Sequence, residues 1–392
     1  MTSTDPVATG IAVDAHGNTV TDDDPLFVRG VVNIGILGTD KLCAQKMRII
    51  DLDTGTTLGQ FYSFESAFNG GESIAVADMN GDGIDEIIVG AGAGRVAEIR
   101  VYTQLGAELT GYRTLAWPST YKSGIEVAVG DVDGDGDNDL IAVQKTGAVQ
   151  VKVFSNTPGA ADPIADTPSL TLNPFPTTFT GGAEVTVANL VANQGSLAAD
   201  PVEIVVGNGK GMRSTIYVYQ RMNATTWSIV DTIQPYASTY TGGINLTTAR
   251  VDGDAIPDII VSPIAGNNST VEIWSGSTTD TTDVRISSFT TFNDLASRNA
   301  AVYTYPLDWN KDGIAEKIVA VQGSSGTAPG PRIWNTNGSS YTQMTVPLAP
   351  WTIGGFNTID PSILNSYKVA AGTGYGGAGE ADGSSNLLQV TP

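Results

Sequence analysis

The sequence is poor in the residues that often carry chemistry. It contains one cysteine, Cys43, and one histidine, His16, among 392 residues. A single cysteine excludes a disulfide within the chain, and we interpret Cys43 as a small buried hydrophobic residue. Lysine and arginine together number 20 against 41 aspartates and glutamates, which gives a net charge of −21. A surface so acidic repels nucleic acid and anionic membranes, so we expect no nucleic-acid partner.

Long apolar runs and enzyme motifs are also absent. No run of 18 apolar residues occurs, so we expect no membrane insertion. The start of the chain, MTSTDPVATG, lacks the features of a signal peptide, which indicates that any export signal has been removed or that the chain is a fragment. No G-x-S-x-G nucleophile motif and no Walker pattern is found, and His16 alone does not indicate catalysis. We therefore expect no catalytic residue.

The chain does contain a repeat that runs through its whole length. FNGGESIAVADMNGDGIDEIIVGAGAG, from Phe68, aligns without a gap to YKSGIEVAVGDVDGDGDNDLIAVQKTG, from Tyr121. Further copies start at 179, 240 and 301, and weaker ones at 10 and 353. The equivalent loops start at Asp14, Asp78, Asp131, Asn189, Arg250, Asp308 and Asp360. A spacing of roughly 50–65 residues is typical of one propeller blade per repeat.

Each repeat has the pattern of four short strands. An alternating strand such as SIAVAD is followed by an acidic loop, an apolar strand such as EIIVGAG, a third strand such as EIRVY, and a fourth after a turn. We therefore predict an all-β fold: a seven-bladed β-propeller of four-stranded antiparallel blades, forming a single domain over residues 1–392. The units run approximately over 10–67, 68–120, 121–178, 179–239, 240–298, 299–352 and 353–392. Six blades are the alternative, if residues 10–60 merge with 356–392. An open solenoid would need polar caps at both ends, and none is seen.

The repeats resemble a known family. The Phe68–Gly71 element, the D-x-[DN]-G-D-G-x-x-[DE] loop and the VGAGAG element resemble FG-GAP/VCBS-type repeats, the blades of integrin-α-like propellers and of many bacterial surface proteins. The resemblance implies the propeller fold and calcium binding. It does not select a function, because that family includes adhesins, lectin-like modules and accessory domains of enzymes.

The acidic loops are candidate calcium sites. In DVDGDGDND, the side chains of Asp131, Asp133, Asp135 and Asp139 and the carbonyl of Asp137 supply oxygens that a hard cation requires. A cation among these like charges explains why the chain keeps them together. Two more loops fit the pattern. They are Asp78, Asn80, Asp82 and Glu86 with the carbonyl of Ile84, and Asp308, Asn310, Asp312 and Glu316 with the carbonyl of Ile314. We therefore expect about three structural Ca²⁺ ions, bound more weakly where the loop has three acids instead of four.

Three loops depart from the pattern. Arg250 replaces the first acid before Asp252, Asp254 and Asp258, and we interpret it as a built-in cation in place of the metal, with a distorted calcium site as the alternative. The loops at Asn189 and Asp14 have few acids and should not hold calcium well.

The sequence favours a binding module over an enzyme. We expect an extracellular, secreted or cell-surface adhesion or scaffold module with an unidentified protein or glycan ligand on its loop face. The irregular loops starting at Asn156, Val191 and Gln322 are the candidate partner surface. A propeller-type polysaccharide lyase or a glycan-binding lectin is the alternative. A lyase would need clustered basic residues, which the sequence does not show, while Trp117 and Trp351 are candidates for stacking on sugars.

Overall fold

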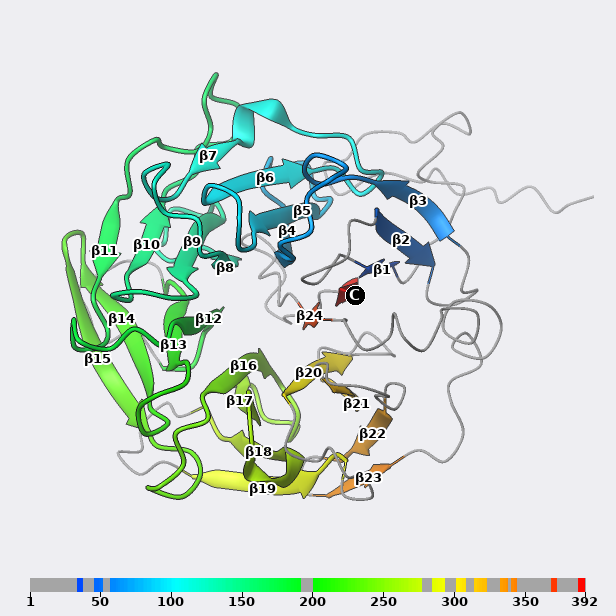
Figure 1. Ribbon diagram of the computed structural model, residues 1–392, viewed down its shortest axis with the longest axis vertical. Helices are drawn as coiled ribbons and strands as arrows, with labels where there is room; N and C mark the ends of the chain where they lie inside the picture. Colours follow the sequence, from blue (N-terminus) through cyan, green and yellow to red (C-terminus); the bar gives the residue numbers. More distant parts are fainter. Residues whose placement is uncertain are drawn as a thin grey trace, which may run out of the picture.

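The computed structural model of the 392-residue chain is a ring of β-sheets (Figure 1). It describes residues 34–37, 46–51, 57–191, 200–276, 284–292, 301–307, 314–322, 332–337, 340–343, 368–371 and 387–391. Within these ranges the helical segments are two three-residue 3-10 turns, Thr110–Tyr112 and Asn267–Ser269. Nowhere in this part of the chain does a helix have the length and apolar character needed to cross a membrane.

Five of the sheets in the described ranges are four-stranded antiparallel blades, each built from four consecutive strands. Their bounds are β4 Glu72–Ala77, β5 Glu86–Ala91, β6 Glu98–Tyr102 and β7 Thr114–Leu115; β8 Ile125–Gly130, β9 Asp139–Gln144, β10 Val151–Phe154 and β11 Leu170–Leu172; β12 Ala183–Ala188, β13 Glu203–Asn208, β14 Ile216–Asn223 and β15 Thr226–Ile233; β16 Ile244–Ala249, β17 Asp258–Pro263, β18 Thr270–Trp274 and β19 Arg285–Thr290; β20 Val302–Leu307, β21 Lys317–Gln322, β22 Arg332–Thr336 and β23 Tyr341–Gln343. The first strand of each blade lies toward the centre of the ring (Figure 1).

A further sheet joins the two ends of the chain. Its order is β24-β25-β1-β2-β3, with β1 Ile34–Leu37, β2 Met47–Asp51, β3 Thr57–Phe61, β24 Lys368–Ala371 and β25 Leu387–Thr391. The β1–β25 pair is parallel, with Ile34 opposite Leu387. Strand β24 contacts β20 of one neighbouring blade and β4 of the other, which closes the ring.

This arrangement corrects the predicted blade count. Neither seven nor six four-stranded antiparallel blades is found in the described part of the chain: five are, beside the five-stranded sheet with its parallel pair. The sequence count treated the weak copies starting at 10 and 353 as separate blades. Both contribute strands to one sheet, as the six-blade alternative supposed, but that sheet has five strands and includes a parallel pair. The prediction of an all-β propeller with four-stranded antiparallel blades is confirmed.

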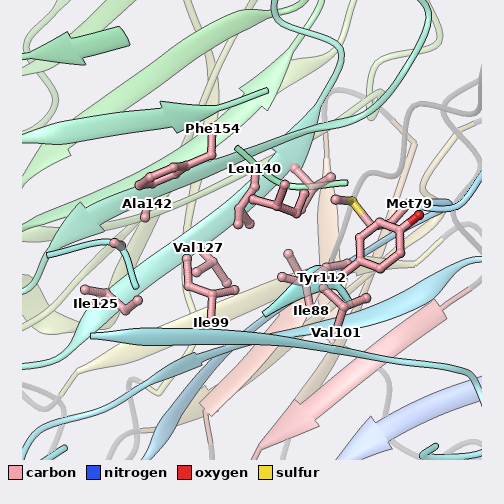
Figure 2. Packing of buried hydrophobic residues seen from close by; sticks show 14 of the residues in the cluster. Met79, Ile88, Ile99, Val101, Tyr112, Ile125, Val127, Leu140, Ala142 and Phe154 are labelled. Atoms are coloured by element: carbon pink, nitrogen blue, oxygen red, sulfur yellow. The ribbon is translucent and has the colours of Figure 1, made fainter. Parts of the chain in front are cut away.

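Packing between adjacent blades forms the core. Figure 2 shows the cluster between the β4–β7 and β8–β11 blades, where Ile88, Val101 and Leu140 are 0% exposed. Every residue of β5 and of β9 is buried, because these second strands are covered by a blade on each side. Met79, in the loop after β4, belongs to the same cluster (Figure 2). The acidic loop after β4 is therefore anchored in the buried core between the two blades.

Candidate metal centre

The loop Asp131–Asp139 connects the innermost strand of its blade, β8, to the buried strand β9. Both oxygens of Asp131 accept backbone hydrogen bonds, Oδ1 from the N–H of Gly134 at 2.6 Å and Oδ2 from that of Gly136 at 3.0 Å. The two glycines have φ of 78° and 96°, a conformation that residues with a side chain rarely adopt. Glycine at these two positions therefore lets the backbone fold around the first carboxylate.

Three carboxylates of this loop converge. Oxygen atoms of Asp131, Asp133 and Asp139 lie within 4.8 Å of one another. Two ligands on opposite sides of a calcium ion are separated by about twice the Ca–O distance of 2.3–2.6 Å, roughly 5 Å. The donor set therefore fits calcium in both chemistry and spacing. Asp135 is outside this group, and its Oδ1 accepts from the N–H of Asp137 at 2.9 Å.

The carboxylate of Asp139 is the most buried of the group. It is 0% exposed, and it accepts from the backbone N–H groups of Val132 at 3.3 Å and Asn156 at 3.2 Å. Burial, followed by the charge of Asp133, raises the pKa of Asp139 to about 8. Burial also raises the pKa of Asp133, which Asp135 raises further and Arg221 opposes. Both shifts mean that the folded loop disfavours the ionised form of these two carboxylates unless a proton or a cation neutralises them.

The loop Asp78–Glu86 repeats this geometry in the preceding blade. Asp78 accepts from the N–H groups of Gly81 and Gly83, both at 2.7 Å. The N–H of Asp82 donates to Asn80 Oδ1 at 2.9 Å, and that of Ile84 to Asp82 Oδ1 at 2.8 Å. The two loops therefore share the same backbone hydrogen bonds to their first aspartate.

The two loops differ at the third and ninth positions. Glu86 is 2% exposed, and it accepts from the Asn80 side-chain amide and from the Met79 N–H, both at 2.9 Å. Burial raises its pKa to about 7. Asn80 stands where the other loop has Asp133, so this loop offers two carboxylates, Asp78 and Glu86, at the three positions that converge in the Asp131 loop.

The structure describes only part of the third candidate loop. Asp308, Asn310 and Asp312 lie outside the described residues, as do His16, Asp14 and Asp360. Ile314 and Glu316 are described and half-buried, just before β21. The prediction for this loop stays a prediction.

In the loop with Arg250, the arginine side chain bonds to the backbone of the same loop. Arg250 Nε donates to the carbonyl of Asp254 at 2.7 Å, and no hydrogen bond from it to a carboxylate is found among the described residues. Asp258 is 0% exposed, its Oδ2 accepts from the Val251 N–H at 2.9 Å, and its Oδ1 has no hydrogen-bond partner among those residues. Burial raises the pKa of Asp258 to about 7.

In the β12–β15 blade, the buried acid at the start of the second strand contacts the side-chain amide of Gln220. Glu203 is 0% exposed; its Oε1 accepts from Gln220 Nε2 at 2.9 Å and its Oε2 from the N–H groups of Leu190 at 2.7 Å and Val191 at 3.2 Å. Burial raises its pKa to about 7. Both oxygens of Glu203 have protein partners, and the expectation that this loop does not hold calcium well stays a prediction.

Sequence reasoning missed the residues that link one loop to the next blade. Asn138 Nδ2 donates to the carbonyl of Asp78 at 2.8 Å, and Asn156 Nδ2 to that of Met79 at 2.8 Å. Arg221 lies beside Asp133. None is part of the nine-residue ligand pattern, so only knowledge of which blades are neighbours could have identified them.

The structure also bears on the alternative of a polysaccharide lyase or lectin. Arg95, Arg100 and Arg113 do gather, although the sequence shows no basic cluster. All three form ion pairs with Glu98. Arg95 also pairs with Glu65, and Arg100 and Arg113 with Glu108, so three carboxylates largely neutralise the three charges. Trp117 is 5% exposed, which leaves its ring unavailable for stacking on a sugar. Trp351 lies outside the described residues.

Comparison with known proteins supports the resemblance seen in the sequence. The family model of the FG-GAP-like repeat matches residues 78–142, which include both described candidate loops. The fold and this match define the protein as a β-propeller that carries an FG-GAP-like repeat.

More distant similarities extend over larger parts of the chain. Integrin alpha-5 of Xenopus laevis is 34% identical over 128 residues, covering 28% of this chain and 12% of that protein. Among solved structures, a putative 6-phosphogluconolactonase from Bacteroides fragilis has 10% identity and a TM-score of 0.49, covering 79% of each chain. The exotype rhamnogalacturonan lyase YesX has 13% identity and a TM-score of 0.39, covering 79% of this chain and 60% of that one. These structural similarities do not assign a function to this chain.

Proposed function

We propose that the protein is a calcium-stabilised binding or scaffold module that works outside the cell. The observation that carries the calcium assignment is the convergence of Asp131, Asp133 and Asp139 within 4.8 Å, with Asp139 fully buried. Three carboxylates held so closely repel one another unless a cation neutralises them. Calcium accepts irregular oxygen coordination, and a loop that supplies its own ligands suits it.

Calcium in this loop has a structural role. The loop sets how β8 leads into β9, and Asp139 accepts from Asn156, which is bonded to the neighbouring loop. A cation bound to the folded loop but not to the unfolded chain adds its binding free energy to the stability of the blade. The contiguous loop supplies most of the ligand sphere, which disfavours an open catalytic position.

The external location and the binding role rest on composition and resemblance. A net charge of −21 with a single cysteine suits surroundings rich in calcium, where millimolar concentrations saturate sites of modest affinity. The local match to integrin alpha-5 supports the same assignment. The irregular segment from Asn156 to Pro168, between β10 and β11, offers an accessible surface for a protein or glycan partner, since Ala160, Ala161, Asp162 and Asp166 are exposed.

Calcium stoichiometry and thermal unfolding test the proposal together. After equilibrium dialysis against millimolar calcium, elemental analysis of the protein minus that of the dialysate should find about three ions per chain, and excess EDTA should lower the melting temperature. Asp131→Asn should remove one ion, whereas Asp166→Asn, at an exposed position outside the loops, should remove none. An unchanged melting temperature in EDTA and no bound calcium would overturn the assignment.

A further inference from the structure

The outer hairpin of the β12–β15 blade reaches toward the candidate metal loop of the β8–β11 blade. Strands β14 and β15 have eight residues each, longer than the outer strands of the other described blades. Arg221 lies near the end of β14, opposite Trp227 on β15. The extra length of the hairpin carries Arg221 to Asp133, 88 positions away in the sequence.

Hydrogen bonds from all three guanidinium nitrogens hold Arg221 in place. Its Nη1 donates to the main-chain carbonyl of Asp133 and lies 3.7 Å from the Asp133 carboxylate. Its Nε donates to the carbonyl of Asn223 at 3.3 Å and its Nη2 to that of Ala224 at 3.2 Å. The side chains of Arg221 and Asp133 are 15% and 24% exposed. The guanidinium is therefore a fixed and poorly solvated charge.

A fixed positive charge beside a ligand opposes the binding of a second cation. The guanidinium stays protonated at any physiological pH, and partial burial reduces the screening of its charge by solvent. It stabilises the Asp133 carboxylate in the absence of calcium and repels calcium when the ion enters. In the Asp78 loop the third position is Asn80, and no arginine forms an ion pair with Asp78, Asp82 or Glu86 in the described ranges.

We propose that Arg221 sets the calcium affinity of the Asp131 loop, by acting as a counter-charge at Asp133, and thereby links calcium binding in one blade to the outer hairpin of the next. This inference rests on the proposed calcium-binding function. It reduces the advantage expected from counting acids: the loop with four acids gains less affinity than its charge indicates, because one of them is already paired.

Calcium titration of charge variants tests the affinity part. Calorimetry is carried out in a D82N/D312N background, which weakens the other two candidate loops. R221M should tighten calcium binding about tenfold, equivalent to about 1.4 kcal/mol. R221K keeps the charge and should stay within about twofold of the parent. R213M, which removes an exposed arginine far from Asp133 in the sequence, should leave the affinity unchanged.

Trp227 provides a readout of the link to the hairpin. In the D82N/D312N background, which also weakens the loop that contains Trp309, calcium addition should change the Trp227 emission, because the ion alters the charge balance beside its cross-strand partner Arg221. W227F should remove this calcium-dependent signal, and R221M should greatly reduce it. Circular dichroism without calcium checks that each variant folds, and R221Q replaces R221M should the methionine variant fail to fold.

The outcomes separate this inference from the proposed function. Calcium binding that is equally tight, or weaker, in R221M would overturn the role of Arg221 while leaving the calcium site in place. Equal tightening in R221K and R221M would overturn the charge mechanism. No calcium binding by the wild-type protein would overturn the proposed function itself, and this inference with it.

Discussion

The side-chain amide of Asn156 donates to the main-chain carbonyl of Met79 at 2.8 Å, across the boundary between two blades. Asn156 follows β10, and Met79 follows β4 in the preceding blade. Asn156 is 1% exposed and the Met79 side chain 0% exposed. The backbone N–H of Asn156 donates in turn to Asp139 at 3.2 Å. One residue therefore connects the two described candidate loops.

Loss of this amide should destabilise the protein. Asn156→Ala leaves the Met79 carbonyl without its buried donor, which costs about 1–3 kcal/mol. Chemical denaturation should show a lower free energy of unfolding. Asn173→Ala, at an exposed position, is the control and should change it little. Equal effects of the two substitutions would argue against the interblade contact.

The buried acid Glu203 should make stability depend on pH. Its pKa is raised from about 4.5 to about 7 in the folded protein, so the folded state binds more protons than the unfolded state between these values. Stability is therefore highest below about pH 4.5 with respect to this group and falls as pH rises toward 7, by on the order of 3 kcal/mol.

Glu203→Gln isolates that contribution. The amide is neutral at every pH, so the fall in the free energy of unfolding between pH 4.5 and 7 should become shallower than in the wild type. Denaturant titrations at a series of pH values measure this slope. Asp231→Asn, in the same blade on β15, serves as the control and should keep the wild-type slope. A Glu203→Gln profile parallel to wild type would contradict the shift.

A single substitution should create a new calcium loop at Arg250. Arg250→Asp restores the first acid of the sequence that continues with Asp252, Asp254 and Asp258, and it removes the charge that bonds to the Asp254 carbonyl. We expect one additional calcium ion per chain by elemental analysis. Arg250→Gln removes the charge without supplying a carboxylate and should add none. Unchanged stoichiometry in Arg250→Asp would show that the backbone of this loop cannot adopt the binding geometry.

Glycine in the Asp131 loop should matter for calcium as well as for folding. Gly136 has φ of 96° and a Cβ there would meet no atom within 4 Å, so Gly136→Ala should cost about 1 kcal/mol through backbone strain alone. Gly94 has φ of 98° and similarly open surroundings, but lies outside the metal loops. Both alanine variants should lower stability, and only Gly136→Ala should weaken calcium binding in a titration.

Much of the architecture could be predicted from the sequence because its signals are local. Alternation of apolar residues and the turn residues between them define four strands per repeat, as in β4 to β7. The nine-residue acidic pattern likewise predicts the loop at Asp131. In the structure, the N–H groups of Gly134 and Gly136 bond to the Asp131 carboxylate. Third strands such as EIRVY and VKVF lie where the pattern indicates, in β6 and β10.

Contacts between distant segments were decided by the tertiary structure. The blade count was wrong because strands from opposite ends of the chain, β1 and β25, pair in one sheet. The sequence offered this merging as an alternative, but it did not show that the merged sheet has five strands and a parallel pair. Arg221 beside Asp133 and Asn156 beside Met79 join residues 88 and 77 positions apart. The repeat by itself determined the blade and the acidic loop, since both depend on neighbouring residues. The packing of adjacent blades determined which charges and amides meet each loop, because those partners come from the blade that packs next to it.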